Sequence, residues 1–201
     1  MRKAALLLFG LAVLNGSANR IEPEEFLSPE RRTAQRKVLE KLRLEQVPLL
    51  DELGAIDGRS ATVTLYTIDP RSLRRDTRNN SLPQPAGVAS FHDWRVLGSA
   101  EIQGENDRTQ LLAELVKGGR QADSAALAGF LPRFALHIAG GVDQAIDVIV
   151  CFESGQAEVY GAKQGKGFIT SLEPANYFSR LAQKVGLTLA AEPVAAPRRL
   201  P

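Results

Sequence analysis

The chain has 201 residues, of which 25 are Lys or Arg, 23 are Asp or Glu and one is Cys. Arg2 and Lys3 account for the whole excess of positive charge, so the chain after residue 18 holds 23 residues of each sign. A near-neutral chain lacks the net positive field that favours binding to nucleic acids or anionic membranes. A single cysteine cannot form an internal disulfide, so we expect the fold to depend on its hydrophobic core.

Residues 1–18 have the composition of a cleavable signal peptide. Arg2 and Lys3 form a short basic segment, residues 4–14 are apolar, and small residues at 16–18 fit cleavage after Ala18. The apolar stretch is shorter than the about 20 residues that a transmembrane helix needs. We therefore expect an exported protein, secreted or periplasmic, with no transmembrane anchor after cleavage.

The first element after the signal peptide is a predicted helix over residues 28–46, because Ser28, Pro29 and Glu30 favour a helix start. Its expected apolar stripe consists of Ala34, Val38, Leu39 and Leu42. The many basic residues around this stripe predict a solvated face, although a cationic helix that meets a membrane or a partner is the alternative.

The next segments predict a strand, a loop, a second strand and a helix. Residues 60–68 alternate in polarity and are rich in Val and Thr, as strands are. Residues 71–90 hold four arginines and little apolar surface, which predicts a long exposed loop. Residues 95–102 predict the second strand, and 107–117 predict a helix that Gly118 and Gly119 end.

The C-terminal half predicts an antiparallel meander. Its expected strands cover 133–138, 145–152, 157–162 and 168–171, and the glycine-containing connections are too short for parallel crossovers. A helix over 174–185 follows, ended by Gly186, and residues 187–201 form a Pro- and Ala-rich tail that we expect to be disordered.

The sequence lacks the compact motifs of common catalytic and cofactor sites. It has no G-x-S-x-G, no phosphate-binding loop, no glycine pattern for dinucleotides and no calcium-loop spacing. The two histidines, His92 and His137, are 45 positions apart, which gives no metal-ligand spacing. We therefore expect no cofactor and no dedicated metal site.

Four residues are candidates for contact with a ligand or partner. His92, Asp93 and Trp94 precede a predicted strand, and a histidine, an acid and an aromatic ring can together hold a ligand. The alternative for Trp94 is that it closes the edge of the core. Arg133 is the fourth candidate.

The sequence also predicts the local environments of His137 and Cys151. His137 alternates with apolar neighbours, so we expect it on the opposite face of its strand, where it can titrate or simply be solvated. Cys151 lies within an apolar strand, which favours a buried, inert thiol over a reactive or cross-linking one.

The segments around Arg133 and Cys151 resemble an uncharacterised group of exported bacterial proteins that carry C-F-x-P-R-H and then C-F-x-C. The similarity covers about residues 60–186. The matching positions are Phe130, Pro132, Arg133, Cys151 and Phe152. Gly129, Phe134 and Ser154 stand where that pattern has Cys, His and Cys. If those residues form a metal or disulfide site in the group, the resemblance implies that this chain has lost it.

These observations predict an α+β fold over residues 60–186: two layers, with a mainly antiparallel sheet of five or six strands. Helices 107–117 and 174–185 cover one face, and the N-terminal segment 19–59 adds a helix. We expect a non-enzymatic binding or envelope-interaction module with an envelope or extracellular protein as partner. The alternative is a small hydrolase or transferase with a site formed by His92, Asp93 and Arg133. A third hypothesis is a metal-free descendant of a Cys/His site.

Overall fold

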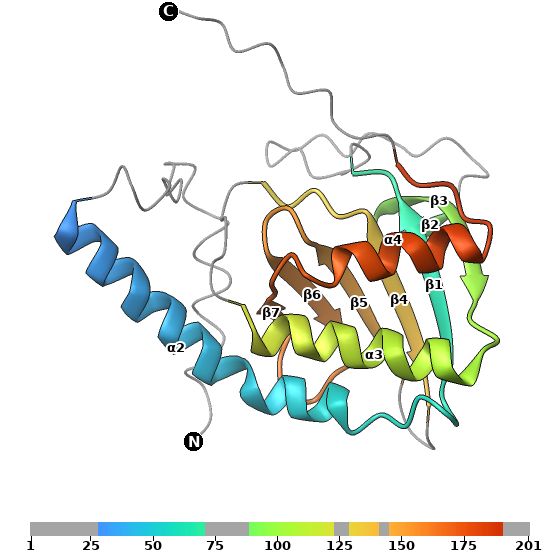
Figure 1. The fold of residues 1–201 in the computed structure, drawn as a ribbon, viewed down its shortest axis with the longest axis horizontal. Coiled ribbons are helices and arrows are strands. Elements are labelled where there is room, and N and C mark those ends of the chain that lie inside the picture. Colours follow the sequence, from blue (N-terminus) through green and yellow to red (C-terminus); the bar gives the residue numbers. More distant parts are fainter. Residues whose placement is uncertain (1–27, 71–88, 123–128, 141–144, 191–201) are drawn as a thin grey trace, which may run out of the picture.

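The computed structural model describes residues 28–70, 89–122, 129–140 and 145–190 (Figure 1). The predicted signal peptide, residues 71–88 of the predicted loop and residues 191–201 of the tail lie outside these ranges. The described helices are α2 (Pro29–Gly54), α3 (Glu105–Arg120) and α4 (Ala175–Lys184). The described strands are β1 (Thr62–Ile68), β2 (Ser90–Phe91), β3 (Trp94–Glu101), β4 (Phe134–Ala139), β5 (Ala145–Cys151), β6 (Gln156–Tyr160) and β7 (Gly167–Ile169).

The strands form one antiparallel sheet in the order β2-β3-β1-β4-β5-β6-β7. Its second half, from β4 to β7, is the predicted meander, and α3 and α4 lie on one face of it (Figure 1). The predicted two-layer α+β fold is therefore confirmed. The described sheet has seven strands where five or six were expected, because the two residues of β2 are too few to show an alternating pattern.

The first helix is longer than predicted, because α2 continues through Pro48 to Gly54. Pro48 has no N–H for the helix bond to the Leu44 carbonyl, but Leu44 is exposed, so water can reach that carbonyl. The last turns hold the residues that dock the helix, since Leu49, Leu50 and Leu53 are buried in the core. Packing of these leucines offsets the cost of the proline.

Most of the residues predicted to form the buried apolar stripe of α2 are not buried. Ala34 is exposed, Val38 is 55% exposed and Leu42 is only partly buried, whereas Leu39 is buried. The reason is visible in Figure 1, where the N-terminal half of α2 extends past the edge of the described sheet.

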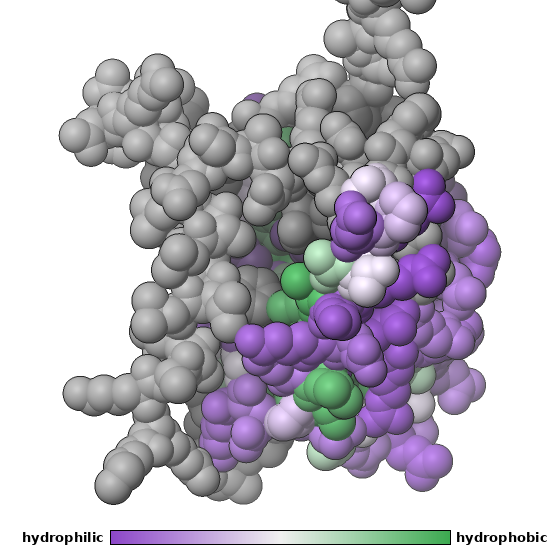
Figure 2. Space-filling model, turned by 90° about the vertical axis from the view of Figure 1, so that its left-hand side faces the viewer, coloured by the Kyte–Doolittle hydropathy of each residue, from purple (hydrophilic) through white to green (hydrophobic). Residues whose placement is uncertain are grey.

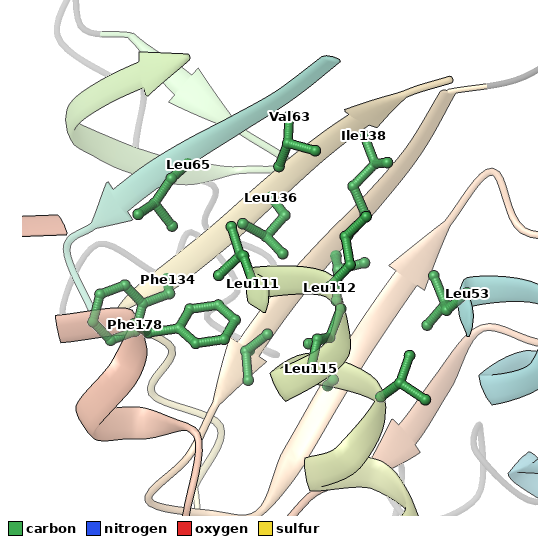
Figure 3. Close-up of a cluster of buried hydrophobic side chains, with 14 of the residues drawn as sticks. Leu53, Val63, Leu65, Leu111, Leu112, Leu115, Phe134, Leu136, Ile138 and Phe178 are labelled. Atoms are coloured by element: carbon green, nitrogen blue, oxygen red, sulfur yellow. The ribbon is translucent and has the colours of Figure 1, made fainter. Parts of the chain in front are cut away.

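The main core lies between the sheet and the helices. Alternate residues of β1, β4 and β5 point toward α3 and α4, as the side-chain alternation of a strand requires. Figure 3 shows this arrangement for Val63, Leu65 and Leu136, which face Leu111 and Leu115. The expected packing of two helices on one face of the sheet is therefore present.

The prediction that Gly118 and Gly119 end α3 is wrong. Both glycines lie inside the helix and are buried. A Cβ atom on Gly118 would lie 2.6 Å from Thr170 Oγ1, and one on Gly119 would lie 2.5 Å from Leu50 Cδ2. These glycines allow α3 to approach its neighbours closely, which is a packing role rather than a helix stop.

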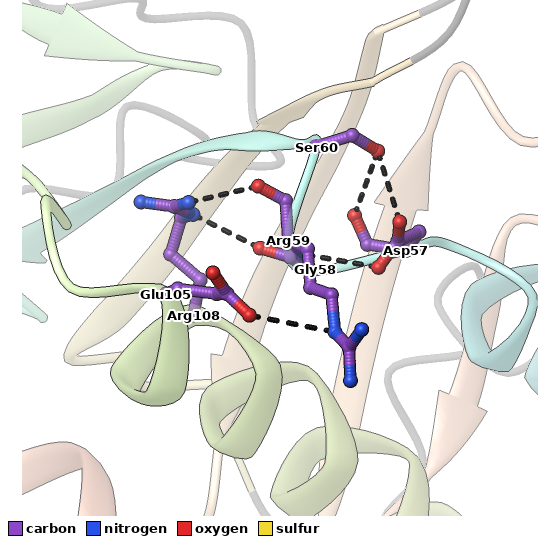
Figure 4. A network of polar contacts seen from close by, with 6 residues as sticks. All are labelled: Asp57, Gly58, Arg59, Ser60, Glu105 and Arg108. Carbon is purple, nitrogen blue, oxygen red and sulfur yellow. Dashed lines mark hydrogen bonds and ion pairs between the residues drawn. The ribbon is translucent and has the colours of Figure 1, made fainter.

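Two side chains fasten the helices to the connections of the sheet. Arg108 of α3 donates to the carbonyls of Gly58 and Arg59 at 2.9 Å and to those of Ile102 and Gln103, so it holds the turn before β1 (Figure 4). Glu52 of α2 accepts hydrogen bonds from two backbone N–H groups of the β6–β7 turn. Both side chains satisfy backbone groups, which indicates a structural role.

The surface around α2 is mainly hydrophilic on the side shown in Figure 2, with small separate hydrophobic areas. Val38, Leu44 and Val47 are exposed, but the spacing of 3.6 residues per turn places them at different angles around the helix. They do not form one apolar stripe. Within the described ranges, no helix is long and apolar enough to cross a bilayer.

Candidate functional site

The face of the sheet opposite the described helices carries a row of polar side chains. Thr64 of β1 pairs with Glu101 of β3 on one side and with His137 of β4 on the other. His137 pairs with Asp147 of β5, which pairs with Tyr160 of β6. Residues that pair across a sheet share a face, so these side chains lie on what we call the helix-free face. The polar row is Glu101, Thr64, His137, Asp147 and Tyr160.

Both histidines of the chain bond to Asp147. One carboxylate oxygen lies 2.6 Å from His92 Nε2 and the other lies 2.6 Å from His137 Nδ1. The side chains of His92, His137 and Asp147 are 30%, 37% and 23% exposed, so solvent reaches all three. An ionised carboxylate only accepts hydrogen bonds, so each imidazole donates to it and keeps its second ring nitrogen, His92 Nδ1 or His137 Nε2, for another partner.

A tight turn brings His92 to this place. His92 and Asp93 have φ values of 45° and 71° and connect β2 to β3, where Phe91 pairs with Trp94. Two consecutive residues with positive φ are the signature of a type I′ hairpin turn, and His and Asp tolerate this conformation better than most residues. Such local strain persists only where the surrounding structure holds it.

Trp94 anchors the hairpin to the helix-free face. The ring is 2% exposed and packs in a second, smaller core with Ile68, Ala135 and Ile149. The prediction that Trp94 closes the edge of a core is confirmed. Because Trp94 is fixed, the adjacent turn holds His92 over β5 and β6.

Aromatic rings border the polar row. His92 stacks on Tyr160 with ring centroids 3.9 Å apart, and Tyr66 lies against Phe91 at 4.6 Å. Burial raises the pKa of Tyr66, and the nearby negative charge of Asp147 raises that pKa further. The Tyr160 hydroxyl donates to Glu158, an exposed acid on the same strand.

The structure separates Arg133 from His92. Arg133, which directly precedes β4, places Nη2 2.9 Å from a carboxylate oxygen of Glu153. His137 lies four positions after Arg133, which corresponds to about 13 Å along a strand. Ala135 lies between them and belongs to the smaller core with Trp94. Asp93 is exposed, and the acid beside His92 is Asp147 rather than Asp93.

Asp147 and Tyr160 were missed in the sequence. Asp147 is the one charged residue in the segment 145–152, whose neighbours are apolar, and this isolation was the available signal. The expectation that His137 lies opposite Leu136 and Ile138 is confirmed, although it binds Asp147 instead of being simply solvated.

Cys151 is buried, as predicted, at 1% exposure. Its Sγ accepts hydrogen bonds from the backbone N–H groups of Leu131 and Ser154, both at 3.4 Å. Phe134 packs in the main core beside Phe178, on the face opposite Cys151. Cys151, which matches the pattern of the exported proteins, and Phe134, which departs from it, therefore lie on different faces of the sheet.

Among the residues that the structure describes, no group of three or more His, Cys, Asp or Glu is arranged to hold a metal ion. No family model matches the sequence, and neither the curated proteins nor the solved structures contain a match to this chain.

Proposed function

We propose that this protein is an exported, non-enzymatic binding module that holds its ligand on the helix-free face, at the polar row and His92. One observation carries the proposal: two histidines 45 positions apart bond to the same carboxylate on a solvent-accessible sheet face. This arrangement needs a strained turn and a buried tryptophan to hold it. Fixed polar groups beside aromatic rings are typical of binding sites.

The signal peptide features of residues 1–18 support the exported location and therefore an envelope or extracellular protein as the partner. The near-neutral charge of the chain after residue 18 argues against nucleic acid as the ligand.

The enzymatic alternative, a hydrolase or transferase that uses His92, Asp93 and Arg133, has weaker support. Arg133 pairs with Glu153, and the smaller core around Trp94 lies between it and the histidines. Acyl and phosphoryl transfer need cations or N–H donors at the developing negative charge. No Lys or Arg side chain occupies a paired helix-free-face position of the polar row.

The proposal is tested by capture from an envelope extract with immobilised chain from residue 19 onward. His137→Gln and Tyr160→Ala alter the polar row, whereas Leu172→Ala changes an exposed apolar residue before α4 and serves as the matched control. We expect a partner that the wild type and the control retain and that both row variants lose. Thermal unfolding of each variant verifies that it is folded.

Two results would contradict the proposal. Capture that is equal for wild type and both row variants would place the binding surface elsewhere. A captured small molecule that the wild type converts chemically, and that His137→Gln leaves intact, would favour the enzymatic alternative.

A further inference from the structure

The two layers of the domain differ in charge. At paired positions of the helix-free face, the Asp, Glu, Lys and Arg side chains are Glu101, Asp147 and Glu158, all acidic. Arg95, in the β2–β3 hairpin, is the one Lys or Arg in the described strands, and the other described Lys and Arg residues lie in helices and connections. The paired positions of the helix-free face are therefore acidic, whereas the chain after residue 18 holds equal numbers of acidic and basic residues.

The same face is rich in hydrogen-bond acceptors. Carboxylates only accept, and a neutral imidazole that donates through one nitrogen accepts through the other. The groups open to a ligand therefore include His92 Nδ1, His137 Nε2 and the oxygens of Glu101 and Glu158. A matching ligand brings donors and positive charge.

Aromatic rings on this face are a second feature that favours one chemical class of ligand. Tyr160 is exposed beside Glu158, and Tyr66 is partly exposed next to Phe91. A guanidinium group stacks on such rings and donates up to five hydrogen bonds, whereas a carboxylate or phosphate group has neither property.

We propose that the ligand of this face is a basic peptide segment that crosses the strands, with one arginine side chain near Glu158 and Tyr160 of β6 and another near Glu101 of β3. This inference rests on the binding function proposed above and adds the chemical class of the partner. Charge complementarity favours a basic ligand over an acidic one. An anionic partner would meet three acids and no Lys or Arg at the paired positions of this face.

The test is a fluorescence-polarisation titration with a labelled, capped peptide of alternating Arg and Gly, at about pH 8 and at salt of about 50 and 200 mM. Peptides with Gln or Glu in place of Arg are the chemical controls. Glu101→Gln and Glu158→Gln each remove one acid from the face without touching the histidine contacts. Glu173→Gln is the matched control, because it removes the same charge from an exposed acid next to α4.

We expect the Arg peptide to bind and the Gln and Glu peptides not to bind. Each face variant should raise Kd about fivefold, and added salt should weaken binding. Glu173→Gln should leave Kd within about twofold of the wild type.

Three results would overturn the inference. Equal weakening by Glu173→Gln would show unspecific attraction to the whole protein, and a preference for the Glu peptide would reverse the sign of the ligand. If no peptide binds while the extract partner still depends on His137 and Tyr160, the binding function stands and the basic ligand is wrong. Failure of both experiments would instead reject the binding function itself.

Discussion

The side-chain oxygen of Gln46 in α2 accepts a hydrogen bond from the backbone N–H of Ile169 in β7 at 2.9 Å. The Gln46 amide nitrogen donates to the carbonyl of Gly119 in α3 at 2.7 Å, so one buried side chain joins two helices and the edge strand. An edge strand has unpaired backbone groups, and here a helix side chain satisfies one of them. This contact explains why α2 belongs to the domain even though half of its length projects.

Gln46→Leu should therefore destabilise the protein although leucine is the more apolar residue. The change leaves the buried N–H of Ile169 without its partner and removes one of the two hydrogen bonds that the Gly119 carbonyl accepts, which costs about 2 kcal/mol of unfolding free energy. Urea unfolding measures this loss. Gln110→Leu, at an exposed position of α3, is the control and should change stability by less than about 0.5 kcal/mol. Equal stability of the Gln46 variant and the wild type would contradict the role assigned to Gln46.

Gly118→Ala should destabilise the protein even though alanine favours helices. Its Cβ would lie 2.6 Å from Thr170 Oγ1 and 2.7 Å from Pro174 Cγ, and the rigid proline ring cannot turn away. Overpacking of this kind costs about 1–3 kcal/mol. Gly54→Ala is the control, since its nearest neighbour would be 3.8 Å away. Thermal unfolding of the two variants should show a lowered Tm for Gly118→Ala alone.

Asp147→Asn should loosen the β2–β3 hairpin. The amide accepts through one oxygen and donates through its nitrogen, so the two histidines can no longer both donate to it, and the negative charge between the two rings is lost. We expect a loss of about 1–2 kcal/mol in unfolding free energy. Trp94 is the one tryptophan of the chain and lies in the contact below the turn, so its fluorescence reports the hairpin.

The expected signal is a red shift of Trp94 emission at low denaturant, before the main unfolding transition. Asp51→Asn, which breaks the surface ion pair with Arg120, is the matched control and should leave the emission unchanged. A wild-type emission spectrum for Asp147→Asn throughout that range would show that the histidine contacts do not hold the hairpin.

Stability should fall at alkaline pH. Burial is the larger cause that raises the pKa of both Tyr66 and Tyr177 above 10.0, and nearby acids raise both further. The folded state therefore holds these protons more tightly than the unfolded state. This contribution is fully present below pH 10.0 and is lost as the pH rises through the raised pKa values.

The measurement compares the wild type with the Tyr66→Phe, Tyr177→Phe double variant by urea unfolding at about pH 8.5 and about pH 11. The double variant loses the Tyr177 hydrogen bond to the Asp107 carbonyl, so its stability is lower at both pH values. The decline between the two pH values should nevertheless be smaller than in the wild type. An identical decline would refute the contribution of these tyrosines.

Cys151 should resist thiol reagents in the folded protein. Its side chain is 1% exposed and receives two backbone hydrogen bonds, so a reagent reaches it only after local opening. We expect reaction with a chromogenic disulfide to be at least about a hundredfold slower in buffer than in denaturant. Rapid reaction in buffer would mean that the segment around Cys151 opens readily.

The sequence by itself determined the elements whose pattern is local. Alternating residues defined β1, β3 and the meander from β4 to β7, and the apolar spacing of Leu111 and Leu115 defined α3. These patterns arise because a strand or helix buries one side, so periodicity records which side faces the core. The short connections of the meander also required antiparallel pairing.

Only the tertiary structure decided the end of α2 and the composition of the candidate site. Pro48 argued locally against a continuing helix, and long-range burial of Leu49, Leu50 and Leu53 overrode it. The sequence analysis grouped His92 with Asp93 and Arg133. In the structure, His92 instead bonds to Asp147, which also bonds to His137. Sheet register and the curl of a hairpin set these contacts, and neither leaves a trace in the spacing of residues along the chain.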